Sequence, residues 1–183
     1  MISTGDFPVL ITGRLILREL LTSDAAAIFS VFSDSIVTEY YGLETFHTLH
    51  DAEQFLSALD DGYMQGKSIR WGIELAETGD LIGTIGFHNW SHVHNRTEIG
   101  YELNRAYWGN GYMSEAMRCI LAFGFSNIGF HRIGATIRPE NKESIALVER
   151  FGFIQDGLLQ DYQRTSKGYF PLYMYSLLRP DFT

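Results

Sequence analysis

The sequence has little cysteine, few cationic side chains and no long apolar run. Cys119 is the only cysteine, so no intrachain disulfide can form, and a reducing compartment is expected. No window approaches the roughly 18 to 20 apolar residues that are needed to span a bilayer. Residues 1–6 carry no basic stretch followed by an apolar one, so we expect no signal peptide. Together these absences favour a cytoplasmic protein that does not act in a membrane.

The shortage of positive charge bears on the partner. Asp and Glu number 22 against 14 Lys and Arg, and the formal net charge is −8. Nucleic-acid binding needs a positive surface, so direct contact with nucleic acid is disfavoured. An acidic surface attracts cations, so the expected partner is an amine, either a small molecule or a basic protein segment.

Length and composition indicate one ordinary domain over residues 1–183, with 45% hydrophobic and 20% charged residues. Hydrophobic alternation and helical spacing then predict the order of elements. Expected strands cover residues 13–20, 69–75, 81–87, 97–103, 131–137, 154–163 and 169–178. Expected helices cover residues 25–32, 49–65, 112–125 and 141–151. Residues 34–47 read as irregular and residues 88–96 as a loop. This order predicts an α/β fold with a mixed sheet and helices on both faces.

The most informative stretch is a glycine turn directly before the helix predicted at residues 112–125. Gly109 and Gly111 bracket a single residue there. The first turn of a helix leaves several N–H groups unpaired, and the helix dipole adds positive potential. Glycine permits the left-handed backbone of such a turn and lets an anion approach closely. The expected ligand is a phosphate or pyrophosphate. On its own, a G-x-G pattern is also typical of a plain tight turn.

Neighbouring segments make the pattern more specific. Together with the order of elements, they resemble the GNAT superfamily of acetyl-CoA-dependent N-acetyltransferases, and within it the RimJ/RimL-like branch. The segments that carry the resemblance are Arg14–Arg18, Thr78–Phe87, Glu98–Leu103, Tyr107–Ala116 and Asn141–Phe153. The broad GNAT pattern has Gln or Arg where this chain has Ala106. The RimJ/RimL-like branch commonly lacks that residue, and Arg105 is a candidate electrostatic substitute.

The resemblance implies a fold and a reaction. The fold is a seven-stranded, mostly antiparallel sheet in which a central parallel pair splays apart. The reaction is direct transfer of acetyl from acetyl-CoA to a primary amine, with the N-terminal amine of a ribosomal protein as the leading acceptor. Two alternatives stay open: acetylation of a small cationic amine, such as a polyamine, an aminoglycoside or an amino-acid derivative, and a non-catalytic acyl-CoA-binding sensor. Homo-oligomerisation through the last two strands is also left open.

The resemblance also implies a set of cofactor contacts. In this sequence they fall on Tyr101, Glu102, Leu103, Gly109, Asn110, Gly111, Tyr112, Met113, Ser114 and Asn141. Ser144 is implied as the proton donor to the leaving thiolate. As ordinary structural residues, Asn141 and Ser144 fit a helix cap and a polar first-turn position.

A general base is needed because the attacking amine must be neutral. An α-amine has a pKa of about 7.7–8.0 and a lysine amine about 10.4, so the lysine costs roughly 3.5 kcal/mol more to deprotonate at neutral pH. A modest base therefore suffices for an N-terminal acceptor. Glu98 is the first candidate and Glu102 the second, although either also fits an ordinary exposed strand position. A strand N–H around residues 99–101 is a candidate to face the thioester oxygen.

Other chemically suggestive residues read as structural. His88, His92 and His94 lie close in sequence but lack the helical alignment and cysteine partners of common metal sites, so we expect loop histidines and no metal. Cys119 reads as a buried small hydrophobe rather than a nucleophile. Five aromatic residues fit either an acceptor groove or packing, and the sequence does not separate the two: Tyr40, Tyr41, Phe46, Phe87 and Trp90.

Overall fold

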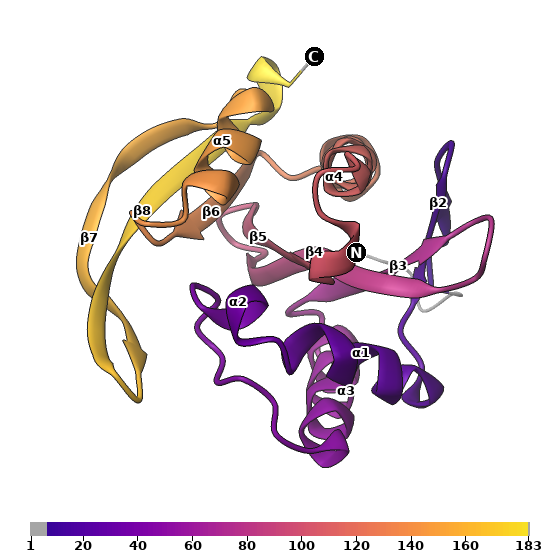
Figure 1. The fold of residues 1–183 in the computed structure, drawn as a ribbon. Coiled ribbons are helices and arrows are strands. Elements are labelled where there is room, and N and C mark those ends of the chain that lie inside the picture. The colour runs from indigo at the N-terminus through magenta and orange to yellow at the C-terminus, as the bar shows by residue number, and fades with distance from the viewer. Residues whose placement is uncertain (1–6, 183) are drawn as a thin grey trace.

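The computed structural model describes residues 7–182. Residues 1–6, where no signal peptide is expected, and residue 183 lie outside the described residues. Eight strands form one sheet in the order β1-β2-β3-β4-β5-β6-β8-β7 (Figure 1). The strands are β1 (Leu10–Ile11), β2 (Leu15–Glu19), β3 (Ile69–Leu75), β4 (Leu81–Ser91), β5 (Arg96–Leu103), β6 (Arg132–Ile137), β7 (Ile154–Thr165) and β8 (Gly168–Leu178).

The predicted mixed sheet is confirmed. Every neighbouring pair of strands is antiparallel except β5 and β6, which are parallel. The sheet has one strand more than the seven expected, because β1 adds a two-residue pairing in which Leu10 faces Leu17 and Ile11 faces Ile16. A strand of two residues is too short to show an alternation of polar and apolar residues.

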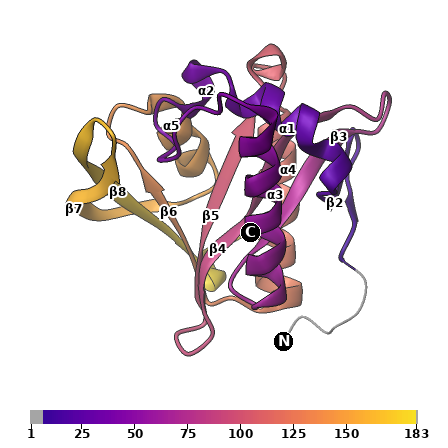
Figure 2. The ribbon, with the colours of Figure 1, turned by 90° about the horizontal axis from the view of Figure 1, so that it is seen from below.

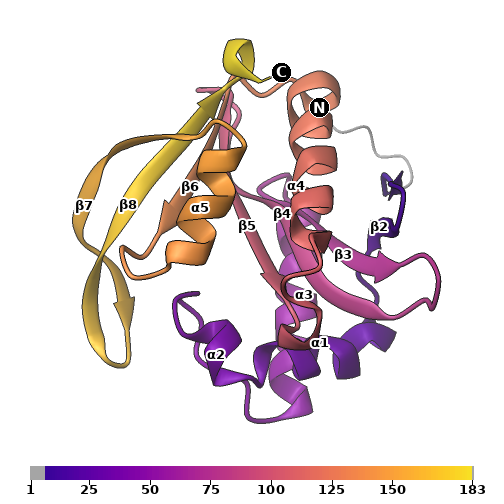
Figure 3. The same cartoon turned by 45° about the horizontal axis from the view of Figure 1, so that its top comes forward.

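Helices cover both faces of the sheet, as predicted. They are α1 (Ala25–Phe32), α2 (Ser35–Thr38), α3 (Leu49–Met64), α4 (Tyr112–Phe123) and α5 (Lys142–Arg150). Figure 3 shows α4 and α5 on one side of the sheet and α1 and α3 on the other. Within the described residues, no helix is long and apolar enough to cross a bilayer.

Two stretches differ from the prediction. Residues 34–47, expected to be irregular, contain the single-turn helix α2, whose first turn is capped by Asp34 accepting from the Ile36 N–H at 2.9 Å. Residues 88–96, expected to be a loop, are mostly strand, because β4 continues to Ser91 and pairs there with β5. Asn89 has a left-handed backbone (φ 51°) and the register shifts beside it, so a bulge hides the alternation in the sequence.

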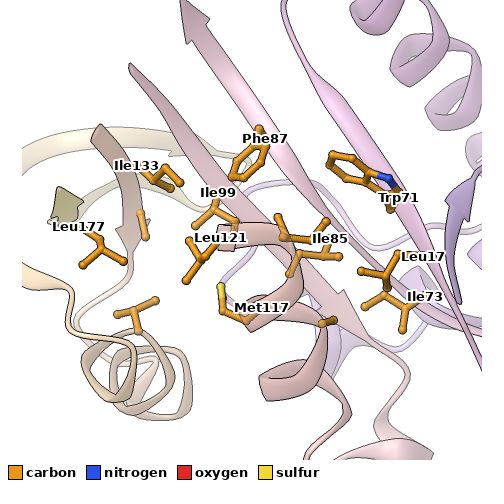
Figure 4. Close-up of a cluster of buried hydrophobic side chains, with 14 of the residues drawn as sticks. Leu17, Trp71, Ile73, Ile85, Phe87, Ile99, Met117, Leu121, Ile133 and Leu177 are labelled. Atoms are coloured by element: carbon orange, nitrogen blue, oxygen red, sulfur yellow. The ribbon is translucent and has the colours of Figure 1, made fainter. Parts of the chain in front are cut away.

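The main core lies between α4 and the middle of the sheet. One face of α4 carries four fully buried side chains at helical spacing: Ala116, Met117, Ile120 and Leu121. In Figure 4, Met117 and Leu121 point toward Ile85 and Ile99 of the central strands. Burying such a side chain stabilises the fold by roughly 1.5–3 kcal/mol. This packing holds α4 against the middle of the sheet and so fixes the position of the turn that precedes the helix.

A second, smaller core lies on the opposite face, between α1 and α3. Its buried members are Ala25, Ile28, Val31, Phe32, Ala52 and Leu56. Phe46 stacks on Phe32 with ring centres 4.9 Å apart, so this aromatic residue of the connection packs in a core. The second core fixes the connection from α1 to α3, which includes α2, beside the diverging strands.

Candidate active site

The glycine turn before α4 has the geometry of an open helix N-terminus. Gly109 and Gly111 both have left-handed backbones, with φ of 77° and 78°. Gly111 is the N-cap residue of α4 and makes no side-chain cap, and among residues 7–182 no other side chain accepts from the N–H groups of the first turn. The N–H groups that open the helix are therefore available to an anionic ligand. The side chain of Asn110 turns back and donates to the carbonyls of Tyr107 and Trp108, which stabilises the turn.

A cation that the sequence did not reveal stands beside this turn. Arg14 donates through Nη1 to the carbonyl of Asn110 at 3.0 Å and through Nε to the carboxylate of Glu115 at 2.7 Å. Arg105, considered from sequence as the electrostatic substitute, instead pairs with Asp34 at 2.8 Å. Arg14 therefore both anchors the turn and supplies a positive charge next to it. The position of Arg14 depends on the packing of β2 against α4, and the spacing of residues in the sequence does not show this packing.

The second element of the site is the gap between β5 and β6. These strands pair through only three positions, of which the last is Glu98 opposite Gly134. Beyond that point they diverge, as Figure 2 shows. On its other side β5 stays paired with β4 as far as Leu103. The edge of β5 that faces β6 is thus unpaired from residue 99 onward.

The direction of the peptide groups along this edge follows from the antiparallel pairing with β4. Peptide groups alternate between the two sides of such a strand, and the N–H of Asn104 donates to the carbonyl of Ile82 on β4. The N–H and C=O groups of Ile99, Tyr101 and Leu103 therefore face the gap, and those of Glu102 face β4. The carbonyl of Leu103 already accepts from Nε1 of Trp108 at 2.7 Å. Tyr101 therefore lies between the closed end of the gap and the occupied carbonyl of Leu103, with its N–H and C=O directed into the gap.

A cleft of about 1040 Å³ occupies this gap and runs past the glycine turn. Its lining contains most of the predicted site residues: Tyr101, Glu102, Leu103, Gly109, Gly111, Tyr112, Met113, Ser114, Asn141 and Ser144. Two predicted residues of the described chain, Glu98 and Asn110, are not part of the lining. Helix α2 and the loop after it close one end of the cleft, and the β7–β8 hairpin contributes Gln163 there.

Asn141 and Ser144 meet across the start of α5. The Asn141 side-chain oxygen accepts from the Ser144 N–H at 3.1 Å, so Asn141 caps the helix. Both residues also line the cleft, so the structural and functional readings from sequence coexist. The hydroxyl of Tyr101 reaches over from β5 and donates to the Ser144 carbonyl at 3.5 Å. Burial raises the pKa of Tyr101 to about 12, so this hydroxyl stays protonated at neutral pH. The sequence predicts only a backbone contact for Tyr101, so the position of its hydroxyl is an additional feature of the site.

Glu98 lies at the closed end of the gap rather than on its wall. The residue is 6% exposed, and its carboxylate accepts from the hydroxyl of Thr136 at 3.4 Å. Thr136 itself lines the cleft. The polar path from Glu98 to the cleft therefore runs through this hydroxyl.

Glu102, the second candidate base, is held in a buried ion pair. Both of its carboxylate oxygens accept from Nη2 of Arg70 at 2.5 Å, and the Thr84 hydroxyl donates to one of them at 2.5 Å. Arg70 also donates through Nε to Thr84 at 2.8 Å. Both oxygens of this carboxylate are therefore occupied by donors before an amine arrives, and breaking such a buried pair is costly.

The three histidines do not act together. His88 lies in β4 rather than in a loop and lines the cleft. Its Nε2 is 3.2 Å from where a Cβ on Gly100 would stand. Burial, reinforced by the charge of Arg70, lowers the pKa of His88 to about 4, so its imidazole is neutral at neutral pH. His92 instead contacts the carbonyl of Gly66 at 2.8 Å.

Cys119 lies away from the cleft. It lines a second hollow of about 420 Å³ with Thr12 and residues of α4, among them Ser114, which also lines the cleft. Burial raises the pKa of its thiol, so the thiolate is disfavoured. The side chain is only partly buried, so the predicted full burial is wrong, while its position and its thiol pKa both disfavour a role as nucleophile.

The aromatic residues that fitted either an acceptor groove or packing fall into two groups in the structure. Tyr40 and Tyr41 line the end of the cleft beside α2. Phe87 is 1% exposed in the main core, and Trp90 packs on Phe130 with ring centres 4.9 Å apart. Arg138, which sequence reasoning did not consider, also lines this end of the cleft.

An open helix N-terminus beside a split parallel pair is suited to an enzyme that holds a nucleotide-linked acyl carrier and transfers its acyl group. Residues 14–154 match the family model described as Acetyltransferase (GNAT) domain. The chain therefore belongs to the GNAT family and is an N-acetyltransferase of the acyltransferase class.

Similar proteins support this assignment. The chain is 41% identical over 174 residues to an uncharacterized N-acetyltransferase, YoaA, of Bacillus subtilis, covering 95% of this chain and 98% of that one. It is 26% identical over 129 residues to the ribosomal protein uS5-alanine N-acetyltransferase of Escherichia coli, covering 70% and 66%. RimL, described as a ribosomal L7/L12 alpha-N-protein acetyltransferase in complex with coenzyme A, shares the fold with a TM-score of 0.84. It is 16% identical, with 93% of this chain and 98% of that one covered.

Proposed function

We propose that this protein transfers acetyl directly from acetyl-CoA to the N-terminal amine of a protein, with a ribosomal protein as the leading acceptor. The observation that carries the proposal is the continuity of one cleft from the uncapped start of α4 to the unpaired edge of β5. A diphosphate at the first and an extended acyl arm along the second would both be held by backbone groups.

The cofactor half fits coenzyme A group by group. The N–H groups from Gly109 to Ser114 would bind the pyrophosphate, with Arg14 adding charge. The free peptide group of Tyr101 would pair with the pantetheine arm as an added strand. The amide nitrogen of Asn141 would contact the same ligand, because its oxygen is already used in capping α5. Surface charge of the acidic chain is screened beyond about 8–10 Å and does not oppose these contacts.

The chemistry requires one proton to leave the amine and one to reach the thiolate. As the amine attacks the thioester carbon, the C–N bond forms and the C–S bond breaks. We assign Glu98 as the base, acting through the hydroxyl of Thr136. We assign Ser144 as the donor to the thiolate, with Tyr101 next to it as the second candidate. An N–H near residues 99–101 would stabilise the oxyanion.

The position of the single cysteine supports direct transfer without an acyl-enzyme on sulfur. Cys119 is the only cysteine, and it lies outside the cleft with a raised thiol pKa. An acyl-enzyme on sulfur would need a thiolate within reach of the thioester. Incubation with radiolabelled acetyl-CoA alone is expected to leave no stable label on the chain.

The acceptor assignment rests on relatives and on amine chemistry. The uS5-alanine and L7/L12 enzymes are described as acting on ribosomal proteins. An α-amine is easier to deprotonate than a lysine amine by roughly 3.5 kcal/mol at neutral pH. This smaller cost suits Glu98, which would act through the hydroxyl of Thr136 and not by direct contact with the amine.

A small cationic amine is the second candidate acceptor. Glu39 and Glu143 line the cleft, and the chain carries a net charge of −8. Both features attract cations. The same two features also suit a basic protein N-terminus. An assay that includes both small amines and peptides is therefore needed to separate the two candidate acceptors.

That assay is release of free thiol from acetyl-CoA with a panel of acceptors. The panel contains peptides with free N-termini and matched peptides whose N-termini are acetylated and which carry an internal lysine. It also contains polyamines and aminoglycosides. We expect thiol release with the free N-terminal peptides and none with the blocked ones. Turnover confined to polyamines or aminoglycosides would overturn the peptide assignment, and coenzyme A binding without thiol release from any amine would make the protein a sensor.

A further inference from the structure

One polar atom in the described part of the chain is buried without a partner. It is the side-chain oxygen Oε1 of Gln163, in β7. Gln163 also lines the cleft, at the end formed by α2 and the loop after it. Buried polar atoms in folded proteins nearly always have a hydrogen-bond partner, so an unpartnered oxygen beside a cleft is an acceptor that a ligand can use.

The side chain is aimed by a bulge. The pairing of β7 with β8 shifts between Leu159 opposite Leu172 and Gln163 opposite Phe170, so residues 160–162 face the single residue Pro171. Proline has no N–H to give to the ladder, which favours an irregularity at this point. Asp161 within the bulge has a left-handed backbone, with φ of 49°. Bulges beside active sites commonly redirect a side chain in this way.

The loop after α2 leaves room for the redirected amide. Gly42 has φ of 97°, and a Cβ there would stand 2.5 Å from Nε2 of Gln163. Gly42 lines the cleft as well. The Gln163 amide of β7 therefore lies against the loop that carries Gly42, more than a hundred residues away in sequence. This contact is at the end of the cleft away from the glycine turn.

The chemistry of an amide selects its ligand. A glutamine side chain offers one acceptor oxygen and two N–H donors, which match the N–H and C=O of a peptide unit. A polyamine offers only N–H donors, so it would leave the glutamine N–H groups unused. We infer that Gln163 binds a backbone peptide unit of the acceptor near its N-terminus and so favours peptides over simple amines. This inference rests on the proposed function.

The test is a coupling experiment between the enzyme and the peptide backbone. Wild type, Gln163→Leu and Gln163→Glu are assayed by thiol release with an alanine-initiated tetrapeptide and with versions N-methylated at the second, third or fourth residue. We expect one N-methyl peptide to lose about tenfold in kcat/KM with wild type. Gln163→Leu should lose about tenfold with the unmodified peptide and show no further loss with that N-methyl peptide. Gln163→Glu keeps an acceptor oxygen and should retain the sensitivity to N-methylation.

Two controls separate binding from folding. Gln160→Leu changes an exposed glutamine of the same bulge and should leave kcat/KM unchanged. The Tm of Gln163→Leu should not fall, because the substitution removes an unpartnered atom rather than a bond. A lower Tm with loss of coenzyme A binding would mark a structural role and overturn the inference.

The outcomes distinguish this inference from the proposed function. If peptides are acetylated but the effects of Gln163→Leu and of N-methylation add at every position, only the role of Gln163 is overturned. If thiol is released with spermidine but with none of the peptides, the proposed function and the role of Gln163 are both overturned. The same holds if no acceptor of the panel leads to thiol release.

Discussion

The two halves of the cleft are built in different ways. The half that we propose holds coenzyme A offers mainly backbone groups, at the start of α4 and along the free edge of β5. The half that we propose holds the acceptor is lined by side chains from segments far apart in sequence, among them Tyr40, Arg138 and Gln163. A backbone site needs only glycines and regular elements in the right order, so many chains of one fold can share it. A side-chain site is specific to the chain that carries it.

The largest expected effect comes from blocking the backbone site. Gly111→Val places a β-branched side chain at φ 78°, with its Cβ 3.6 Å from the Arg14 guanidinium. Calorimetry should show coenzyme A affinity falling by about a hundredfold, close to 2.7 kcal/mol. The matched control is Gly79→Val, which has φ 76° and open space in the β3–β4 turn. Equal affinities in the two variants would contradict the anion-site role of the turn.

A second variant tests where the two halves meet. Ser144→Ala removes the assigned proton donor but keeps the backbone N–H that Asn141 caps. Removing a positioned general acid costs roughly a hundredfold or more in rate. We expect kcat to fall by about that factor and coenzyme A affinity to change less than threefold. Should Tyr101→Phe reproduce the loss while Ser144→Ala does not, the proton comes from the tyrosine.

The neutral imidazole of His88 predicts a pH effect on stability. The unfolded chain binds a proton at His88 below its ordinary pKa of 6.5, whereas the folded chain does so only near 4. Stability is therefore lost as pH falls from 6.5 toward 4. His88→Gln should remove roughly 2 kcal/mol of that loss between pH 7 and 4.5, measured by urea unfolding at each pH. Parallel pH curves for the two proteins would mean that His88 titrates normally.

The smallest expected effect concerns the cation beside the turn. Arg14→Gln removes a half-exposed charge that contacts Asn110 and Glu115. Coenzyme A affinity should weaken about fivefold at low ionic strength and less at high salt, because exposed charges are screened. Arg105→Gln, whose arginine pairs with Asp34, should leave the affinity unchanged. Equal losses in both variants would indicate a general charge effect rather than a contact at the turn.

The sequence predicted the backbone half far better than the side-chain half, for a physical reason. Gly109, Gly111 and the helix after them are a local pattern, and the order of strands then brings β5 and β6 together. By contrast, the contact of Arg14 with the turn and the aim of Gln163 depend on pairings between distant segments. His88 was misplaced because the bulge at Asn89 interrupts the alternation of β4. Glu98 was correctly placed on β5, yet only the structure shows that Thr136 stands between its carboxylate and the cleft.

We propose that backbone amides after Trp108 hold the diphosphate and that the edge of β5 holds the acyl arm. Amide NMR of isotope-labelled protein titrated with coenzyme A observes these groups one by one. We expect the largest shifts, and protection from exchange, at the N–H groups of residues 109–114 and of Tyr101. Saturable binding that leaves those amides unmoved and shifts others would contradict this proposal.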